Sequence, residues 1–146
     1  SQLDFDFDLV TEKTKENPVF YVQYASARIH SILRKVELKK DDFDKKNLNF
    51  LDSEAEIDLI KKLSLWSKCL ELSSNNLEPH RIPYYLYDLA SSFHSYWNLG
   101  KENNDFRIIE NENMALVHAR VFLLEKVLMV IKSGLSILGV SAPDSM

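Results

Sequence analysis

Two tyrosines and one arginine stand at spacings that place them on the same face of a predicted helix near the start of the chain. Tyr21, Tyr24 and Arg28 are separated by three and four residues, which aligns their side chains along an α-helix. Phenol rings stack on unpaired RNA bases, and a guanidinium group stacks on a base or binds a phosphate. The spacing also fits two tyrosines at the edge of a core, with Arg28 paired to a carboxylate. By itself, the spacing favours this structural interpretation over RNA binding.

A second aromatic group lies farther along the chain, in another predicted helix. Its members are Tyr84, Tyr85, Tyr87, Phe93, Tyr96 and Trp97. We expect Tyr96 and Trp97 at the C-terminal end of that helix, where side chains can extend past a helical bundle. A strongly aromatic core is the alternative, and the spacing alone favours it.

No pattern typical of a catalytic or metal-binding site is found in the sequence. The four histidines stand apart from one another and form no H-x-x-x-H pair: His30, His80, His94 and His118. The single cysteine, Cys69, lies in an apolar helical stretch, where burial should raise the pKa of its thiol. Glycine-rich phosphate loops and a G-x-S-x-G motif are absent from the sequence. We therefore expect no catalytic, cofactor-binding or metal-binding residue in this chain.

The composition indicates one soluble domain with an acidic balance. The chain has 146 residues, 45% of them hydrophobic, and a formal net charge of −4. Much of that charge belongs to residues 1–17, so basic groups elsewhere could still bind RNA locally. No apolar run is long enough for a membrane span, and no leader-like segment opens the chain. We expect a cytoplasmic protein, and a start at Ser1 suggests a processed chain or an excised fragment.

Hydrophobic periodicity and capping residues predict four main helices. Asn17 and Pro18 begin the first, which runs to about residue 36, and a charged connection follows at 39–50. A capping box at residues 53–56 begins a second helix that runs to about 72. The third spans about 79–99 and the fourth about 113–133, with an apolar turn at 135–138. All three glycines, at 100, 134 and 139, are expected where a helix ends.

The predicted fold is all-α, a compact bundle of four to five helices with a short extended N-terminal arm. Residues 3–9 alternate apolar and acidic side chains, which indicates a strand. A strand without a sheet in this chain suggests that residues 1–16 are an arm or linker from a domain that is absent. Residues 17–146 form the predicted helical domain.

Three segments, in the same order along the chain, resemble those of one protein family. Residues 17–28 are N-P-V-F-Y-V-Q-Y-A-S-A-R, residues 87–98 contain Y-D-L-A and F-H-S-Y-W-N, and residues 139–146 are G-V-S-A-P-D-S-M. Together they closely resemble the C-terminal DALR anticodon-binding domain of bacterial arginyl-tRNA synthetases. The resemblance extends over nearly the whole chain.

The resemblance implies which residues contact RNA. The family contacts the anticodon loop through the positions that are here Tyr21, Tyr24 and Arg28, and the position of Trp97 faces the anticodon region. Gln23 and Met146 are further candidates for RNA contacts. Trp97 stands where the family usually has tyrosine, which keeps a stacking face and exchanges a hydroxyl for an indole N–H. Gln23 belongs to the motif, although an intramolecular hydrogen bond would explain it equally well. Ser26 replaces the more common histidine of the first motif.

The resemblance also implies a function for the longer protein. The family ligates arginine to its tRNA using ATP and magnesium, on a catalytic domain whose H-I-G-H-like and K-M-S-K-S-like motifs are missing here. We therefore expect a monomeric C-terminal fragment, inactive alone, whose partners are the anticodon stem-loop of arginine tRNA and its own catalytic domain. Two alternatives stay open: a helical protein-interaction module, and the anticodon-binding domain of a related synthetase, such as the cysteinyl or glycyl type.

Overall fold

The computed structural model describes residues 17–36 and 44–146, and these residues form five α-helices and two short 3-10 helices. The extended arm predicted for residues 1–16 lies outside the described residues. The elements, in chain order, are α2 (Pro18–Arg34), η2 (Lys45–Phe50), α3 (Glu54–Ser64), α4 (Trp66–Asn75), α5 (Arg81–Glu102), η3 (Asn104–Phe106) and α6 (Met114–Ile137).

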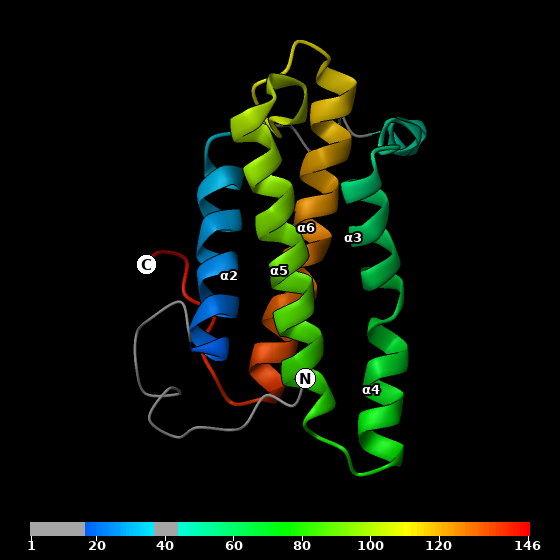
Figure 1. The fold of residues 1–146 in the computed structure, drawn as a ribbon, viewed down its shortest axis with the longest axis vertical. Coiled ribbons are helices and arrows are strands. Elements are labelled where there is room, and N and C mark those ends of the chain that lie inside the picture. The colour runs from blue at the N-terminus through cyan, green and yellow to red at the C-terminus, as the bar shows by residue number, and fades with distance from the viewer. Residues whose placement is uncertain (1–16, 37–43) are drawn as a thin grey trace.

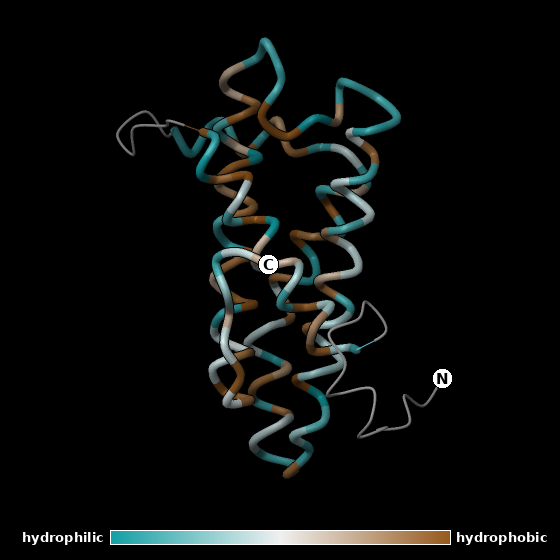
Figure 2. The backbone as a smooth tube through the Cα atoms, turned by 90° about the vertical axis from the view of Figure 1, so that its left-hand side faces the viewer, coloured by the Kyte–Doolittle hydropathy of each residue, from teal (hydrophilic) through white to brown (hydrophobic). Residues whose placement is uncertain are grey.

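Two long helices, α5 and α6, form the centre of the bundle (Figure 1). Helix α2 packs against both of them on one side, and the α3–α4 pair packs on the other. Helix α6 is apolar around most of its circumference, as expected for a buried central helix. In Figure 2 the apolar stretches of the backbone lie mostly along the bundled helices, while the loops at the ends are largely polar. The predicted all-α bundle is therefore confirmed for the described residues.

The predicted second helix is in fact two helices. Helix α3 ends at Ser64 and α4 begins at Trp66, with Leu65 between them. The Ser64 hydroxyl donates to the carbonyl of Lys61 at 2.6 Å, a local bond that competes with regular helix geometry. Part of the predicted connection at 39–50 is also ordered, because Lys45–Phe50 forms a 3-10 helix that packs against α6.

Two of the three glycines lie inside helices, so the prediction that they end helices is wrong. Gly134 faces Leu86 of α5, and a Cβ at this position would lie 2.6 Å from the Leu86 methyl carbons. Gly100 lies close to the backbone of Phe106 and Arg107. Only Gly139 follows a helix end. Its φ of +71° and the hydrogen bond from the next amide to the Leu135 carbonyl form a Schellman cap that closes α6.

A buried ion pair joins three helices and one connecting segment. Arg120 of α6 donates from Nε to Oε2 of Glu56 in α3 at 2.9 Å, and the side chains are 4% and 1% exposed. The phenol of Tyr96, in α5, donates to the same carboxylate oxygen at 2.8 Å. Arg120 also donates from Nη1 to the carbonyls of Asp105 and Arg107, at 2.8 and 3.0 Å. Burial and the neighbouring Glu56 raise the pKa of Tyr96 far above its usual range, so its hydroxyl keeps its proton and donates.

Among the described residues, no helix combines the length and the apolar character that a bilayer span requires.

Replacement of Glu56 by leucine should lower the free energy of unfolding by about 3–5 kcal/mol, because it leaves the Arg120 charge buried without compensation. Urea denaturation followed by circular dichroism measures this. Glu54→Ala, in the exposed first turn of the same helix, is the control and should cost well under half as much. In the Glu56→Leu/Arg120→Met double variant, much of the loss should be recovered. A double variant as unstable as the single one would contradict this account.

Gly134→Ala should destabilise the domain by about 1–3 kcal/mol, because the added methyl group overlaps Leu86 in a packed core. Helix propensity alone predicts the opposite sign, a gain of about 1 kcal/mol. Thermal and urea unfolding distinguish the two. Ser133→Ala, the exposed neighbour on α6, provides the matched control and should be neutral or slightly stabilising. A stabilised Gly134→Ala protein would show that α5 and α6 do not need this close approach.

Candidate nucleic-acid interface

Three of the predicted site residues meet where α2 lies beside the C-terminal half of α5. The guanidinium of Arg28 donates a hydrogen bond from Nη2 to the Tyr24 hydroxyl. Its central carbon lies 4.8 Å from the centroid of the Tyr24 ring and 5.6 Å from the Trp97 ring. Arg28 therefore connects two aromatic side chains from different helices by cation–π contacts.

These three side chains line an open groove of about 360 Å³ on the surface of the bundle. Met146 also lines it, 54% exposed. The remaining lining residues come from the second half of α2, the end of α5 and the C-terminal tail: Ala27, Ser31, Ile32, Arg34, Lys35, Lys101 and Ser145. Four of the six predicted RNA-binding residues thus surround one groove.

The groove is basic although the whole chain carries a net charge of −4. Arg28, Arg34, Lys35 and Lys101 line it, and none of them forms a salt bridge within the described part of the chain. Lys101 was not among the predicted site residues, because α5 was expected to end before Gly100. The helix continues through Gly100 to Glu102, which places Lys101 one turn beyond Trp97 on the same face.

Tyr21 packs against the hydrophobic core and does not line the groove. Its ring centroid is 5.0 Å from that of Tyr87 and 4.7 Å from that of His94. Burial raises the pKa of the Tyr21 phenol. The His94 ring also stacks on Tyr24, with centroids 5.5 Å apart and planes 27° apart. The tyrosine stripe therefore combines both interpretations of its spacing: Tyr21 packs at the core edge, and Tyr24 lines the groove.

The C-terminal tail is held against α2 by polar contacts. Gln23 donates from Nε2 to the carbonyl of Ser141 at 2.8 Å, which is the intramolecular hydrogen bond considered from the sequence. Arg34 donates to the carbonyl of Asp144 at 3.1 Å, and the Asp144 carboxylate lies 3.2 Å from Nε2 of His30. After the turn at Gly139, the tail runs back along α2 (Figure 1). These contacts place Met146 at the groove.

Tyr96 does not extend past the bundle as its position near the helix end suggested. It is fully buried and belongs to the ion-pair network, while its neighbour Trp97 is only partly buried. Cys69 is half-buried, and desolvation raises the pKa of its thiol as predicted. Within residues 17–36 and 44–146, no three histidine, cysteine or acidic side chains come together in an arrangement that could hold a metal ion.

Comparison with known proteins gives one consistent family. Residues 22–146 match the family model of the DALR anticodon binding domain. The chain is 48% identical over 146 residues to the arginine–tRNA ligase of Pelagibacter ubique, covering 99% of this chain and 25% of that protein. It is 49% identical over 144 residues to the arginine–tRNA ligase of Rickettsia prowazekii, covering 94% and 25%.

The fold comparison agrees with the sequence comparison. The arginyl-tRNA synthetase of Thermus thermophilus matches over 100% of this chain and 24% of its own, with a TM-score of 0.76 and 29% identity. The chain thus spans about a quarter of the length of the relatives that it matches.

Proposed function

The chain belongs to the DALR anticodon binding domain family, and from this premise we propose that it binds the anticodon stem-loop of an arginine tRNA. The family resemblance predicted from the three sequence motifs is confirmed. The tRNA and the amino acid are proposed from the names of the relatives, which are arginine–tRNA ligases.

The observation that carries this proposal is the convergence of Tyr24, Arg28 and Trp97 at one basic groove. Two aromatic faces suit unstacked bases, since base–aromatic stacking contributes roughly 1–3 kcal/mol per base. Lysines at the rim suit the phosphates between those bases. A groove of this kind favours a single-stranded loop over a duplex, because only unpaired bases can present their faces to the rings.

The proposed RNA contacts differ in kind among the six predicted residues. Tyr24 and Trp97 stack on bases, Arg28 holds the two rings and binds the RNA, and Met146 contributes an apolar contact at the groove. Gln23 acts at least partly by positioning, because its amide holds the tail that carries Met146. Tyr21 supports the site through its contact with His94, on which Tyr24 stacks.

The activity proposed for the longer protein is ligation of arginine to tRNA with ATP. The remaining three quarters of such a protein would hold ATP and magnesium and carry the chemistry, and this chain alone would not charge tRNA. The proposed partners are therefore arginine tRNA and the protein's own catalytic domain, in a cytoplasmic monomer. The alternative function, a helical protein-interaction module, requires no affinity for RNA.

Tyr24→Ala and Trp97→Ala should each weaken binding of an arginine anticodon stem-loop about 5- to 150-fold, because each removes one stacking face. Fluorescence anisotropy with a labelled RNA hairpin measures the dissociation constants. Tyr84→Ala is the matched control, since Tyr84 is an exposed tyrosine near the other end of α5 and should leave the affinity unchanged.

Normal affinity in both variants would contradict the site assignment. Failure of the unaltered chain to bind the hairpin at any salt concentration would contradict the function and favour the interaction module. Equal affinity for hairpins of cysteine and glycine tRNAs would contradict the choice of arginine tRNA.

Lys35→Gln and Lys101→Gln should each reduce the salt dependence of hairpin binding. If each lysine neutralises one phosphate, the slope of log K against log salt should fall by about 0.7 per substitution. Anisotropy titrations at several salt concentrations give the slope. Lys61→Gln, on the exposed face of α3, should leave it unchanged. A slope unaltered by both groove substitutions would show that these lysines do not meet the RNA.

A further inference from the structure

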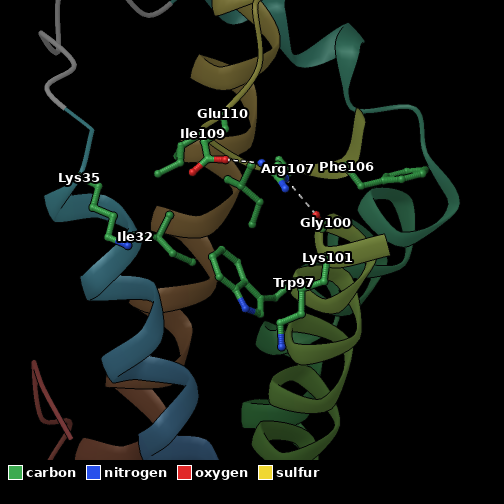
Figure 3. Close-up of a pocket in the computed structure, with 10 residues that line it drawn as sticks. Ile32, Lys35, Trp97, Gly100, Lys101, Phe106, Arg107, Ile109 and Glu110 are labelled. Atoms are coloured by element: carbon green, nitrogen blue, oxygen red, sulfur yellow. Dashed lines mark hydrogen bonds and ion pairs between the residues drawn. The ribbon is translucent and has the colours of Figure 1, made fainter. Parts of the chain in front are cut away.

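A second hollow adjoins the Tyr24–Arg28 groove, and Trp97 lines both of them. Its volume is about 330 Å³, at the lower end of the range of about 300–1,000 Å³ typical of small-ligand sites. Figure 3 shows it between the end of α2, the end of α5 and residues 106–110, with the Trp97 indole below Ile109. No sequence motif pointed to this hollow, because its walls come from three segments that are distant in the chain.

The hollow and the groove are adjoining spaces. Four residues line both of them: Ile32, Lys35, Trp97 and Lys101. Trp97 and both lysines therefore stand at each of the two spaces. A strand of RNA that places one base in the groove would have its next phosphate beside the same two lysines.

The lining of the hollow suits the flat, largely apolar face of a base with polar groups at its edge. Ile32 and Ile108 are buried, and Trp97 and Ile109 are partly buried, while the Phe106 ring points away from the hollow (Figure 3). At the rim, Arg107 donates from Nη1 to Oε2 of Glu110 at 2.7 Å, and both side chains are more than 40% exposed. This pair offers N–H donors and carboxylate acceptors to the edge of a base.

The backbone at residues 106–107 forms one wall of the hollow, and the buried Glu56–Arg120 network holds this wall in place. Arg120 binds the carbonyls on both sides of Phe106, and the Arg107 side chain donates from Nε to the carbonyl of Gly100 at 3.3 Å. Gly100 lets the backbone of 106–107 approach α5 closely, since a Cβ there would lie 3.2 Å from the Phe106 carbonyl oxygen. A wall held in this way needs little ordering when a ligand binds.

We propose that this hollow is a second nucleobase site, which takes the unstacked base adjacent to the one in the Tyr24–Arg28 groove. The inference rests on the proposed function, because it assumes a single-stranded RNA loop at the groove. Trp97 contacts both bases, and Lys35 and Lys101 bind the phosphate between them. The Arg107–Glu110 pair contacts the edge of the second base.

An abasic scan of the hairpin loop tests this proposal. Each loop nucleotide of an arginine anticodon stem-loop is replaced in turn by an abasic one, and affinity for the chain is measured by anisotropy at constant salt. Two adjacent positions should each lose about 5- to 150-fold in affinity. A single sensitive position, or two that are not neighbours, would overturn the proposal while leaving the proposed function intact.

A substitution that fills the hollow with a larger side chain shows which of the two loop positions binds in the hollow. In the Ile109→Trp variant, an abasic nucleotide at one of the two positions should change the affinity less than twofold. An abasic nucleotide at the other position should weaken binding as it does with the unaltered chain. In the Tyr24→Ala variant, the position that keeps its effect in Ile109→Trp should lose it, and the other position should keep it. Ile57→Trp makes the same change on the exposed face of α3 and should preserve both penalties. Both penalties retained in Ile109→Trp would show that the hollow is not occupied by a base.

A second variant keeps the test decisive if Ile109→Trp does not fold, as judged by circular dichroism. Arg107→Ala/Glu110→Ala removes the exposed side-chain pair together with the Arg107 hydrogen bond to the Gly100 carbonyl, and should lower the abasic penalty at the same position at least threefold. An unchanged penalty would overturn the assignment of the hollow. Absence of any binding of the intact hairpin by the unaltered chain would instead contradict the proposed function itself.

Discussion

The ion pair of Glu56 and Arg120 is almost completely removed from water, and its polar atoms find partners inside the protein. The carboxylate accepts from Ser53, Tyr96 and Arg120, and the guanidinium also binds two backbone carbonyls. A buried pair of charges is tolerated only when its geometry and additional hydrogen bonds offset the cost of desolvation. This requirement fixes α3, α5, α6 and the segment after α5 relative to one another.

The candidate RNA site depends on that arrangement. Trp97 directly follows Tyr96, so the hydrogen bond that holds Tyr96 in the core also sets the direction of the indole. The two carbonyls bound by Arg120 set the wall of the second hollow. Across the groove, the Schellman cap at Gly139 returns the tail along α2, where Gln23 and Arg34 hold it. The buried ion-pair network and the exposed contacts of the tail therefore together position the side chains of the groove and the hollow.

Sequence patterns predicted the structure correctly where the interacting residues lie close together in the chain. Asn17 caps α2 through its own side chain, and the capping box of Ser53 and Glu56 is present as predicted. The interpretation of Gly100 and Gly134 as helix ends failed, since glycine also permits close packing of one element on another. Glu56 was explained by its capping role alone, because nothing in its surroundings along the chain indicates that Arg120, 64 residues later, lies beside it.

The sequence by itself determined the family, the helical class and the stripe of Tyr21, Tyr24 and Arg28, because motif order and helical periodicity are properties of the chain. Tertiary structure alone decided that Tyr24 faces the groove while Tyr21 packs against His94. It also decided that Lys101 lines the groove, and that Trp97 lines both the groove and the adjoining hollow. These outcomes depend on which helices pack together and how closely. That packing is set by contacts between residues far apart in sequence, which no local pattern encodes.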